Sequence, residues 1–318
     1  GLAVPIALMV GSGIGAKHGI LIRKGEAIQT MKEVKIIVFD KTGTITKGKP
    51  EVTNVHSLVK ENYLLEVCAS LEKLSEHPVA QAVVKYVNIK KYRKVTQFVT
   101  VRGKGVKGKI AGKQIVIGNR ILMKENNVSL KEVEKVIDTF EKQGKTILIV
   151  SEHGKVIGVL AVADALKDDS FLAIQKLKQM GYRAVMITGD NERTAHAIAK
   201  EAGIDEVIAN VLPEEKAQKV AELQETSMVA FVGDGINDAP ALKQSNVGIA
   251  LGTGTDIAIE AGDLVLVKGS LIGVVEAINL SKATFRKIKQ NLFWAFAYNT
   301  IAIPVAVAGL LPPVFAEI

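Results

Sequence analysis

The sequence has 318 residues, of which 48% are hydrophobic and 23% charged, a composition typical of a folded protein and not of a disordered one. The net charge is +8, but only 5% of the residues are aromatic and the lysines are scattered along the chain, which argues against a nucleic-acid partner. The one cysteine, Cys68, excludes an internal disulfide and a metal site built from several cysteines.

The first sixteen residues, 1–16, contain no charged side chain. They lack the basic leader and the cleavage site that a signal peptide requires. We interpret them as the end of a membrane helix whose beginning lies outside the chain.

Residues 17–52 begin a soluble region. Within them the apolar run KIIVF, residues 35–39, ends in Asp40. A short continuous apolar run of this kind is typical of a parallel strand that is buried on both faces.

Residues 53–154 show a different pattern. Two helical segments, near 62–73 and 79–86, precede short strands with turn glycines, two more helical segments and a closing strand at 146–151. Clustered strands between helices predict a separate α+β domain, inserted into the first one.

Residues 155–268 return to the first domain, because helices and strands alternate there. The predicted strands are 183–187 and 228–232, and the predicted helices are 170–180, 192–202 and one that begins at Pro213. Such alternation predicts the α/β class, with a Rossmann-like parallel sheet covered by helices on both faces.

The C-terminal part divides at about residue 290. Residues 269–290 read as a cytoplasmic helix, and four basic residues near its end are typical of a cytoplasmic membrane flank: Lys282, Arg286, Lys287 and Lys289. No charged residue occurs from 290 to 316, which is long enough to cross a bilayer core of about 30 Å, so we predict a transmembrane helix over 291–318. A solvated basic face and a buried helix of a soluble domain are the alternatives.

Several strand ends carry reactive side chains. Asp40 opens the segment DKTGTIT, TGDN (188–191) follows the strand RAVMI, and GDGIND (233–238) follows the strand MVAFV, while Lys216 begins a helix. Ligands of parallel sheets lie beyond the carboxyl ends of the strands. A nucleophilic carboxylate, hydroxyl donors, a lysine and acids that can hold Mg²⁺ form the set that phosphoryl transfer needs.

The segments DKTGTIT, TGDN and GDGINDAPAL, in this order, resemble those of P-type ATPases. The resemblance implies a haloacid dehalogenase-like phosphorylation domain, formed by 17–52 and 155–268, and an inserted nucleotide-binding domain at 53–154. It also implies that ATP phosphorylates Asp40 to form an aspartyl phosphate. Thr42 stands where soluble phosphatases of this fold place an aspartate, and a threonine cannot deprotonate water, so we expect the phosphoenzyme to persist.

The resemblance assigns roles to further residues of the phosphorylation domain. Mg²⁺ would be held by the Asp40 carboxylate, the Thr42 carbonyl and Asp234. Lys216 and the hydroxyls of Thr42 and Thr188 would contact the phosphoryl oxygens, Gly189 and Asp190 would shape the strand-end turn, and Asn237 and Asp238 would support the loop.

A second set of motifs resembles the heavy-metal-transporting, or CPx, subclass. The segment SEHP resembles its His-Pro motif, which holds adenine, so His77 and the preceding acid Glu72 are predicted ATP ligands, as are Gly103 and Gly105 of the segment GKGVKG. The opening GLAVP resembles the segment after the Cys-Pro-Cys motif. Tyr298 and Asn299 resemble the pair of copper(I) pumps and are predicted to contact the transported metal, with a zinc or cadmium pump as the alternative.

The resemblance implies a multi-pass membrane protein with cytoplasmic catalytic domains. Its partners would be ATP, a heavy-metal ion, which we predict to be Cu⁺, the lipid bilayer, and the remaining membrane helices and actuator domain of the parent pump. No TGE segment of an actuator domain occurs here, so we expect this chain alone to lack full turnover. The alternatives are a soluble phosphatase of the same fold, a non-enzymatic metal-binding membrane protein and an inactive, regulatory half.

Overall fold

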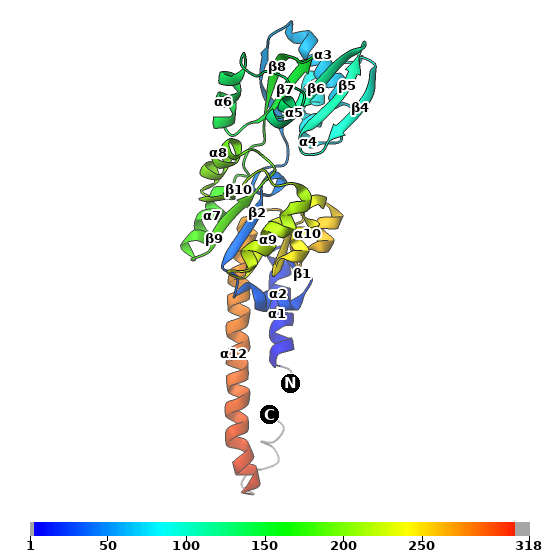
Figure 1. Ribbon diagram of the computed structural model, residues 1–318. Coiled ribbons are helices and arrows are strands. Elements are labelled where there is room, and N and C mark those ends of the chain that lie inside the picture. The colour runs from blue at the N-terminus through cyan, green and yellow to red at the C-terminus, as the bar shows by residue number, and fades with distance from the viewer. Residues whose placement is uncertain (1–2, 309–318) are drawn as a thin grey trace.

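Two β-sheets of opposite kind organise residues 3–308, the part of the chain that this computed structural model describes (Figure 1). The seven-stranded sheet has the order β1-β13-β12-β11-β2-β9-β10 and is parallel except for β1. Its strands are β1 (Ile20–Ile22), β2 (Ile36–Asp40), β9 (Arg183–Ile187), β10 (Glu206–Ile208), β11 (Val229–Gly233), β12 (Val247–Leu251) and β13 (Leu264–Leu266).

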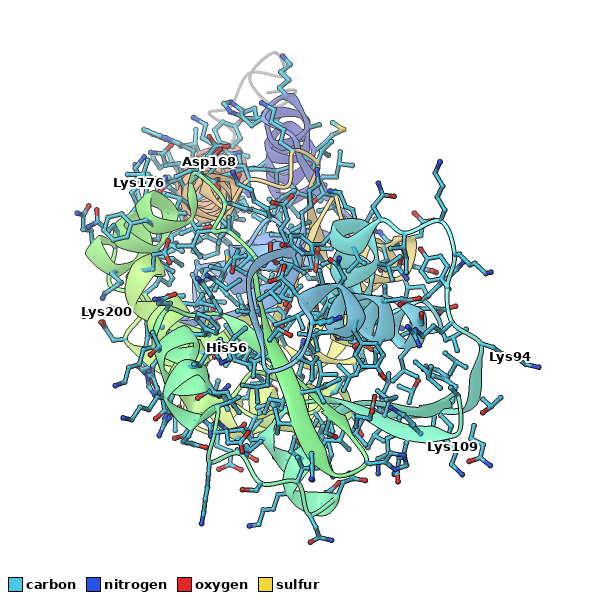
Figure 2. The ribbon with its side chains drawn as sticks, turned by 90° about the horizontal axis from the view of Figure 1, so that it is seen from above. His56, Lys94, Lys109, Asp168, Lys176 and Lys200 are labelled. Carbon is cyan, nitrogen blue, oxygen red and sulfur yellow. The ribbon has the colours of Figure 1, made fainter. Side chains whose placement is uncertain are left out.

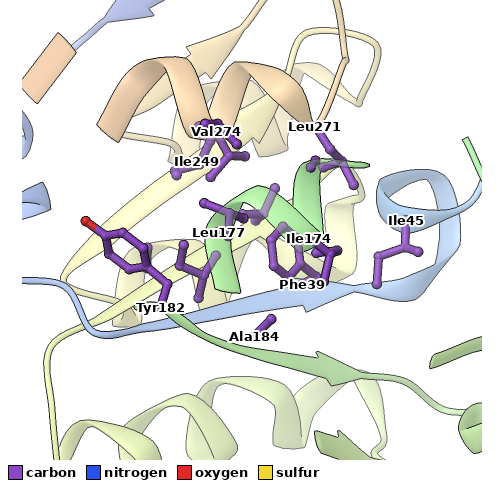
Figure 3. Close-up of a cluster of buried hydrophobic side chains, with 14 of the residues drawn as sticks. Phe39, Ile45, Ile174, Leu177, Tyr182, Ala184, Ile249, Leu271 and Val274 are labelled. Atoms are coloured by element: carbon purple, nitrogen blue, oxygen red, sulfur yellow. The ribbon is translucent and has the colours of Figure 1, made fainter. Parts of the chain in front are cut away.

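The central strand β2 explains why this sheet is buried on both faces. Ile37 and Phe39 lie in one apolar cluster with helices α2, α7, α8 and α12, whereas Ile36 and Val38 lie in another with α9, α10 and α11. Figure 3 shows the first cluster, in which Phe39 lies near Ile174 of α7. The covering helices are α2 (Gly25–Met31), α7 (Ser170–Gln179), α8 (Glu192–Ala202), α9 (Lys216–Gln224), α10 (Ala239–Gln244), α11 (Asp256–Ala261) and α12 (Ile272–Val307). The predicted α/β class is confirmed.

The six-stranded sheet is antiparallel throughout, in the order β3-β8-β7-β6-β5-β4, and it carries the helices of the inserted segment. Its elements are β3 (Glu51–Ser57), α3 (Glu61–Glu72), α4 (Pro78–Val87), β4 (Val95–Val101), β5 (Gly105–Ile110), β6 (Lys113–Gly118), α5 (Arg120–Glu125), α6 (Glu134–Lys142), β7 (Thr146–Glu152) and β8 (Lys155–Ala163). Strand β8, placed above in the first domain, pairs with β3 and β7 and therefore belongs to this sheet. We call residues 51–163 the antiparallel unit and the remaining sheet with its helices the parallel unit.

Helix α12 projects from the parallel unit, with α1 (Ala3–Lys17) beside it (Figure 1). Gly11 permits this close packing, because a Cβ atom there would lie 2.7 Å from Thr284 Oγ1. The first part of α12 buries Val274 and Ile278, whereas Phe293 and Trp294 are exposed farther along.

The two predicted membrane segments differ from the structure. Residues 272–307 form one continuous helix, which joins the predicted cytoplasmic helix at 269–290 to the first part of the predicted transmembrane segment. Among residues 3–308, no helix combines the length and apolar character needed to cross a membrane. Parts of both predicted segments lie outside the described residues. These parts are residues 1–2 of the segment at 1–16 and residues 309–318 of the segment at 291–318.

Candidate active site

The register of the parallel sheet brings three of the predicted segments to one edge. Asp40, the last residue of β2, pairs with Ile187 of β9, and Phe39 pairs with Val232 of β11. The residues that follow β9 and β11, Thr188 and Asp234, therefore leave the sheet beside Asp40.

Lys216 joins two of the acids at this edge. It begins α9 after the turn η2 (Pro213–Glu215), and its Nζ donates to Asp40 Oδ1 at 2.7 Å and to Asp238 Oδ1 at 2.7 Å. All three side chains are buried. Burial alone would lower the pKa of Lys216, but the carboxylates of Asp40 and Asp238 outweigh it and raise this pKa, so the lysine stays charged.

Three carboxylates gather around this one cation. Oxygens of Asp40, Asp234 and Asp238 all lie within 4.8 Å of one another. Burial, followed by the charge of Asp238, raises the pKa of Asp40 to about 6, and burial with the charges of Asp40 and Asp238 raises the pKa of Asp234 to about 7. The cluster thus holds more negative charge than Lys216 can offset.

The individual contacts of these acids indicate which of them could bind a metal. Asp238 is occupied on both oxygens, since Oδ2 accepts from the backbone N–H groups of Asp234 and Gly235 at 3.2 and 3.1 Å. Within the described residues, the Asp234 carboxylate has no hydrogen bond or ion pair. It lies against Gly43, which has φ +74°, and a Cβ there would be 1.9 Å from Asp234 Oδ2. An acid without a partner, in a space kept open by a glycine, fits a hard divalent cation such as Mg²⁺.

The turn that follows β9 is tied to the residue after Asp40. Lys41 Nζ donates to Asp190 Oδ2 at 2.7 Å, and both side chains are largely buried. Thr188 is buried as well, and its Oγ1 accepts from the Asp190 N–H at 3.1 Å. Asp190 thus anchors Lys41 beside Asp40. Sequence reasoning quoted Lys41 within its motif but gave it no role.

Asp164 is a further residue that sequence reasoning missed. Its carboxylate accepts from Thr46 Oγ1 at 2.6 Å and from the N–H groups of Gly48 and Lys49 at 3.2 and 3.1 Å. It therefore fixes the chain that leaves the DKTGTIT turn. A signal was present, because Asp164 directly follows the apolar strand β8, much as Asp40 ends the apolar strand β2.

Two predicted nucleotide ligands lie in the antiparallel unit. Glu72, the last residue of α3, is buried, and this burial raises its pKa to about 7. His77 caps the start of α4, where its Nδ1 accepts from the Val79 N–H at 3.2 Å, which leaves the ring proton on Nε2. Burial, and next the positive charge of Lys41, lower the pKa of His77, so this imidazole lies within electrostatic range of the strand-end site.

The two predicted glycines lie at the turn between β4 and β5. Gly105, at φ +141°, approaches β6 so closely that a Cβ would lie 2.1 Å from the Ile117 carbonyl oxygen, so strand packing alone demands a glycine there. Gly103 faces Leu212 of the parallel unit, and the neighbouring Arg102 pairs with Glu214 at 3.1 Å. The glycine turn therefore contacts the parallel unit two residues before Lys216.

Comparison with known proteins tests this arrangement. Residues 34–246 match the family of haloacid dehalogenase-like hydrolases. Among solved structures, the catalytic domain of the CPx-ATPase CopB-B is similar, with 31% identity and a TM-score of 0.65 over 85% of this chain and 98% of that one. The chain belongs to the CPx class of P-type ATPases.

Other P-type ATPases are also similar to this chain. A copper-exporting P-type ATPase of Staphylococcus saprophyticus is 49% identical over 98% of this chain, and one of Staphylococcus aureus is 47% identical over the same share. A zinc-transporting PIB-type ATPase in its E2.Pi state has 35% identity and a TM-score of 0.70, covering 98% of this chain and 51% of that one. The chain spans 39% of the length of these two copper-exporting relatives.

The remaining predicted residues of this P-type ATPase chain lie away from the acid cluster or at its rim. Asn237 is exposed in the turn η3 (Ile236–Asp238). Tyr298 and Asn299 are exposed on the projecting part of α12 (Figure 1). The structure thus brings Asp40, Asp234, Asp238 and Lys216 together and leaves Tyr298 and Asn299 remote from them.

The buried Glu72 predicts a pH-dependent stability. Its pKa is about 7 in the folded ATPase chain against 4.5 ordinarily, so the folded state binds more protons between these values and stability falls as pH rises from about 4.5 to about 7. Glu72→Gln removes this penalty and should be more stable than wild type by up to about 3 kcal/mol at pH 8, with little difference near pH 4.5. Urea unfolding at both pH values measures it, with Glu61→Gln, an exposed change on the same helix, as control. An equal difference at the two pH values would contradict the prediction.

Proposed function

We propose that this chain is the catalytic part of an ATP-driven heavy-metal pump and that Asp40 is its phosphorylated residue. The observation that carries the proposal is the contact of Lys216 with Asp40 at 2.7 Å, inside a cluster of buried acids at the strand ends. An Asp40 oxygen would attack the terminal phosphorus of ATP, the bond from that phosphorus to the bridging oxygen would break, and ADP would leave.

The residues of the chain have distinct roles in this step. Lys216 keeps Asp40 in place and supplies positive charge to the phosphoryl oxygens. The buried Thr188 hydroxyl and that of Thr42 are proposed donors to the same oxygens. Asp190 holds Lys41, Gly189 permits the strand-end turn, and Asp238 positions both Lys216 and the Asp234 loop.

Asp234, Asp40 and the Thr42 carbonyl are the proposed ligands of Mg²⁺. When bound there, the ion would offset the negative charge of the carboxylates and of the phosphate that approaches them. The contacts of Asp238 with Lys216 and two backbone amides support a positioning role for it, since neither of its oxygens is free for the metal.

ATP would bridge the two units. We propose that Glu72, His77, Gly103 and Gly105 hold the nucleotide, with Asn237 supporting the opposite loop. The electrostatic effect of Lys41 on His77 and the Arg102–Glu214 ion pair support this proposal, because each links a segment that carries predicted nucleotide ligands to the parallel unit. The parent pump would lie in the lipid bilayer with these units in the cytoplasm.

Cu⁺ is the proposed cargo, and Tyr298 and Asn299 are its proposed ligands. The names of the copper-exporting relatives, at 49% and 47% identity, favour it over the zinc transporter at 35%. The test is acid-stable incorporation of ³²P from ATP in the full-length parent pump, with reduced copper, zinc or neither. Cu⁺ should stimulate incorporation and Zn²⁺ should not. Stimulation by Zn²⁺ alone would overturn the choice of metal but not that of Asp40.

A further inference from the structure

Four residues of the parallel unit contact residues 138–146 of the antiparallel unit: Asp190, Asn191, Arg193 and Thr194. Two of the contacts are hydrogen bonds that a threonine hydroxyl donates. Thr146 Oγ1 donates to Asp190 Oδ1 at 3.4 Å, and Thr194 Oγ1 donates to the Lys145 carbonyl at 3.0 Å. The other two involve Asn191 and Arg193. We call these two segments together the interunit clasp.

The charged centre of the clasp is Glu141 of α6. This carboxylate is only 2% exposed, although it lies at the boundary between the units. Arg120 of its own unit donates to it at 3.0 and 3.1 Å, Asn191 Nδ2 approaches it at 3.4 Å, and Arg193 Nη1 lies 3.5 Å away. Arg193 also pairs with Asp138. Charged groups of both units thus meet on one buried acid.

Polar contacts carry much of this boundary. Beside the clasp, between α6 and α8, lies an open groove of about 410 Å³ lined by Asp138, Lys142, Arg193, His196, Ala197 and Lys200. Removal of a charged partner from a buried acid is costly, whereas an exposed ion pair contributes little. Glu141 stays paired with Arg120 when Arg193 is removed, so the contribution of Arg193 lies between these two cases.

The clasp also adjoins the strand-end site. Asp190, its first residue, binds Lys41, and Lys41 follows Asp40 directly. A shift of the antiparallel unit at Glu141 would therefore move the neighbouring turn, whose Asp190 contacts Lys41.

We propose that Arg193 and Glu141 are positioning residues that fasten the antiparallel unit over the strand-end site. Loss of either partner lets the units separate, while each unit stays folded. The proposal concerns the arrangement of the units and does not depend on the proposed chemistry of Asp40.

The test is energy transfer between two dyes, one on each unit. Lys94 and Lys176 are exposed and lie at different sides of the molecule (Figure 2), and Cys68 is buried, so the variant with Lys94→Cys and Lys176→Cys accepts dyes selectively. In this background Arg193→Ala should increase the separated, low-transfer population about fivefold, as the loss of about 1 kcal/mol implies. Arg193→Lys keeps the positive charge and should therefore give a smaller increase in this population than Arg193→Ala.

Two further variants make the result specific. Lys200→Ala removes the same charge from the same helix, where Lys200 makes no ion pair with any described residue, and should leave the transfer efficiency unchanged. Glu141→Gln should act in the same direction as Arg193→Ala and add less than its separate effect in the double variant, because both changes weaken the contact between Arg193 and Glu141. Equal efficiencies in Arg193→Ala and Lys200→Ala, with both proteins folded by circular dichroism, would overturn the proposal.

Discussion

Asp40→Asn is expected to abolish acid-stable phosphorylation by ATP in the parent pump and to leave nucleotide binding within about twofold of wild type. The amide cannot attack phosphorus, because its nitrogen lone pair is delocalised and its oxygen carries no full charge. The other proposed nucleotide ligands lie in the antiparallel unit and are unchanged in this variant, so we expect only a small change in nucleotide affinity. Retained ³²P and the binding of a fluorescent ATP analogue measure the two effects.

The matched control for this variant is Asp168→Asn. Asp168 belongs to the same unit, but its side chain is 92% exposed and forms an ion pair with Lys47 on the surface. The same chemical change there should leave phosphorylation unaltered. Phosphate that stays bound to the Asp40→Asn protein after acid quenching would assign the phosphorylated residue elsewhere.

Lys216→Ala is expected to cost both stability and activity. It leaves the buried carboxylates of Asp40 and Asp238 without their shared cation, a loss of about 3 kcal/mol in the free energy of unfolding. It also removes a fixed charge from the phosphoryl oxygens, so the rate of phosphoenzyme formation should fall by about 10²- to 10³-fold. Urea unfolding and rapid acid quenching provide the two measurements.

Mg²⁺ offers an additional check on this variant. Because the ion would supply positive charge to the same carboxylates, it should stabilise Lys216→Ala more than wild type. Lys219→Ala is the control, since Lys219 lies on the same helix and pairs with Glu222 on the surface, where loss of the pair should change stability by less than about 1 kcal/mol. A wild-type rate of phosphoenzyme formation in Lys216→Ala would contradict the proposed role of Lys216.

The position of Asp40 could be predicted from the sequence because two local features agree. A run of apolar residues specifies a strand buried on both faces, and the rules of parallel sheets place whatever follows such strands at one edge. Lys216 is different. It lies 176 residues from Asp40, and its assignment came from the resemblance of motifs, since no periodicity in the chain relates the two residues.

Other parts of the site depend on contacts that a linear pattern does not contain. The Lys41–Asp190 ion pair spans 149 residues, and the three bonds that Asp164 accepts join it to residues more than a hundred positions away. The extent of α12 was missed for another reason. Charge divides its sequence near residue 290, but backbone hydrogen bonds do not respond to side-chain polarity.

The continuity of α12 has a mechanical consequence. The helix is anchored along its first half, where buried residues extend from Val274 to Ile288, and it continues to Val307. The 19 residues beyond Ile288 correspond to a lever of about 28 Å. A tilt of about 10° at Ile288 would therefore move the far end of the helix sideways by about 5 Å, roughly the pitch of one helical turn. Small rearrangements around the acid cluster would thus be magnified into displacements of atomic dimensions far from it.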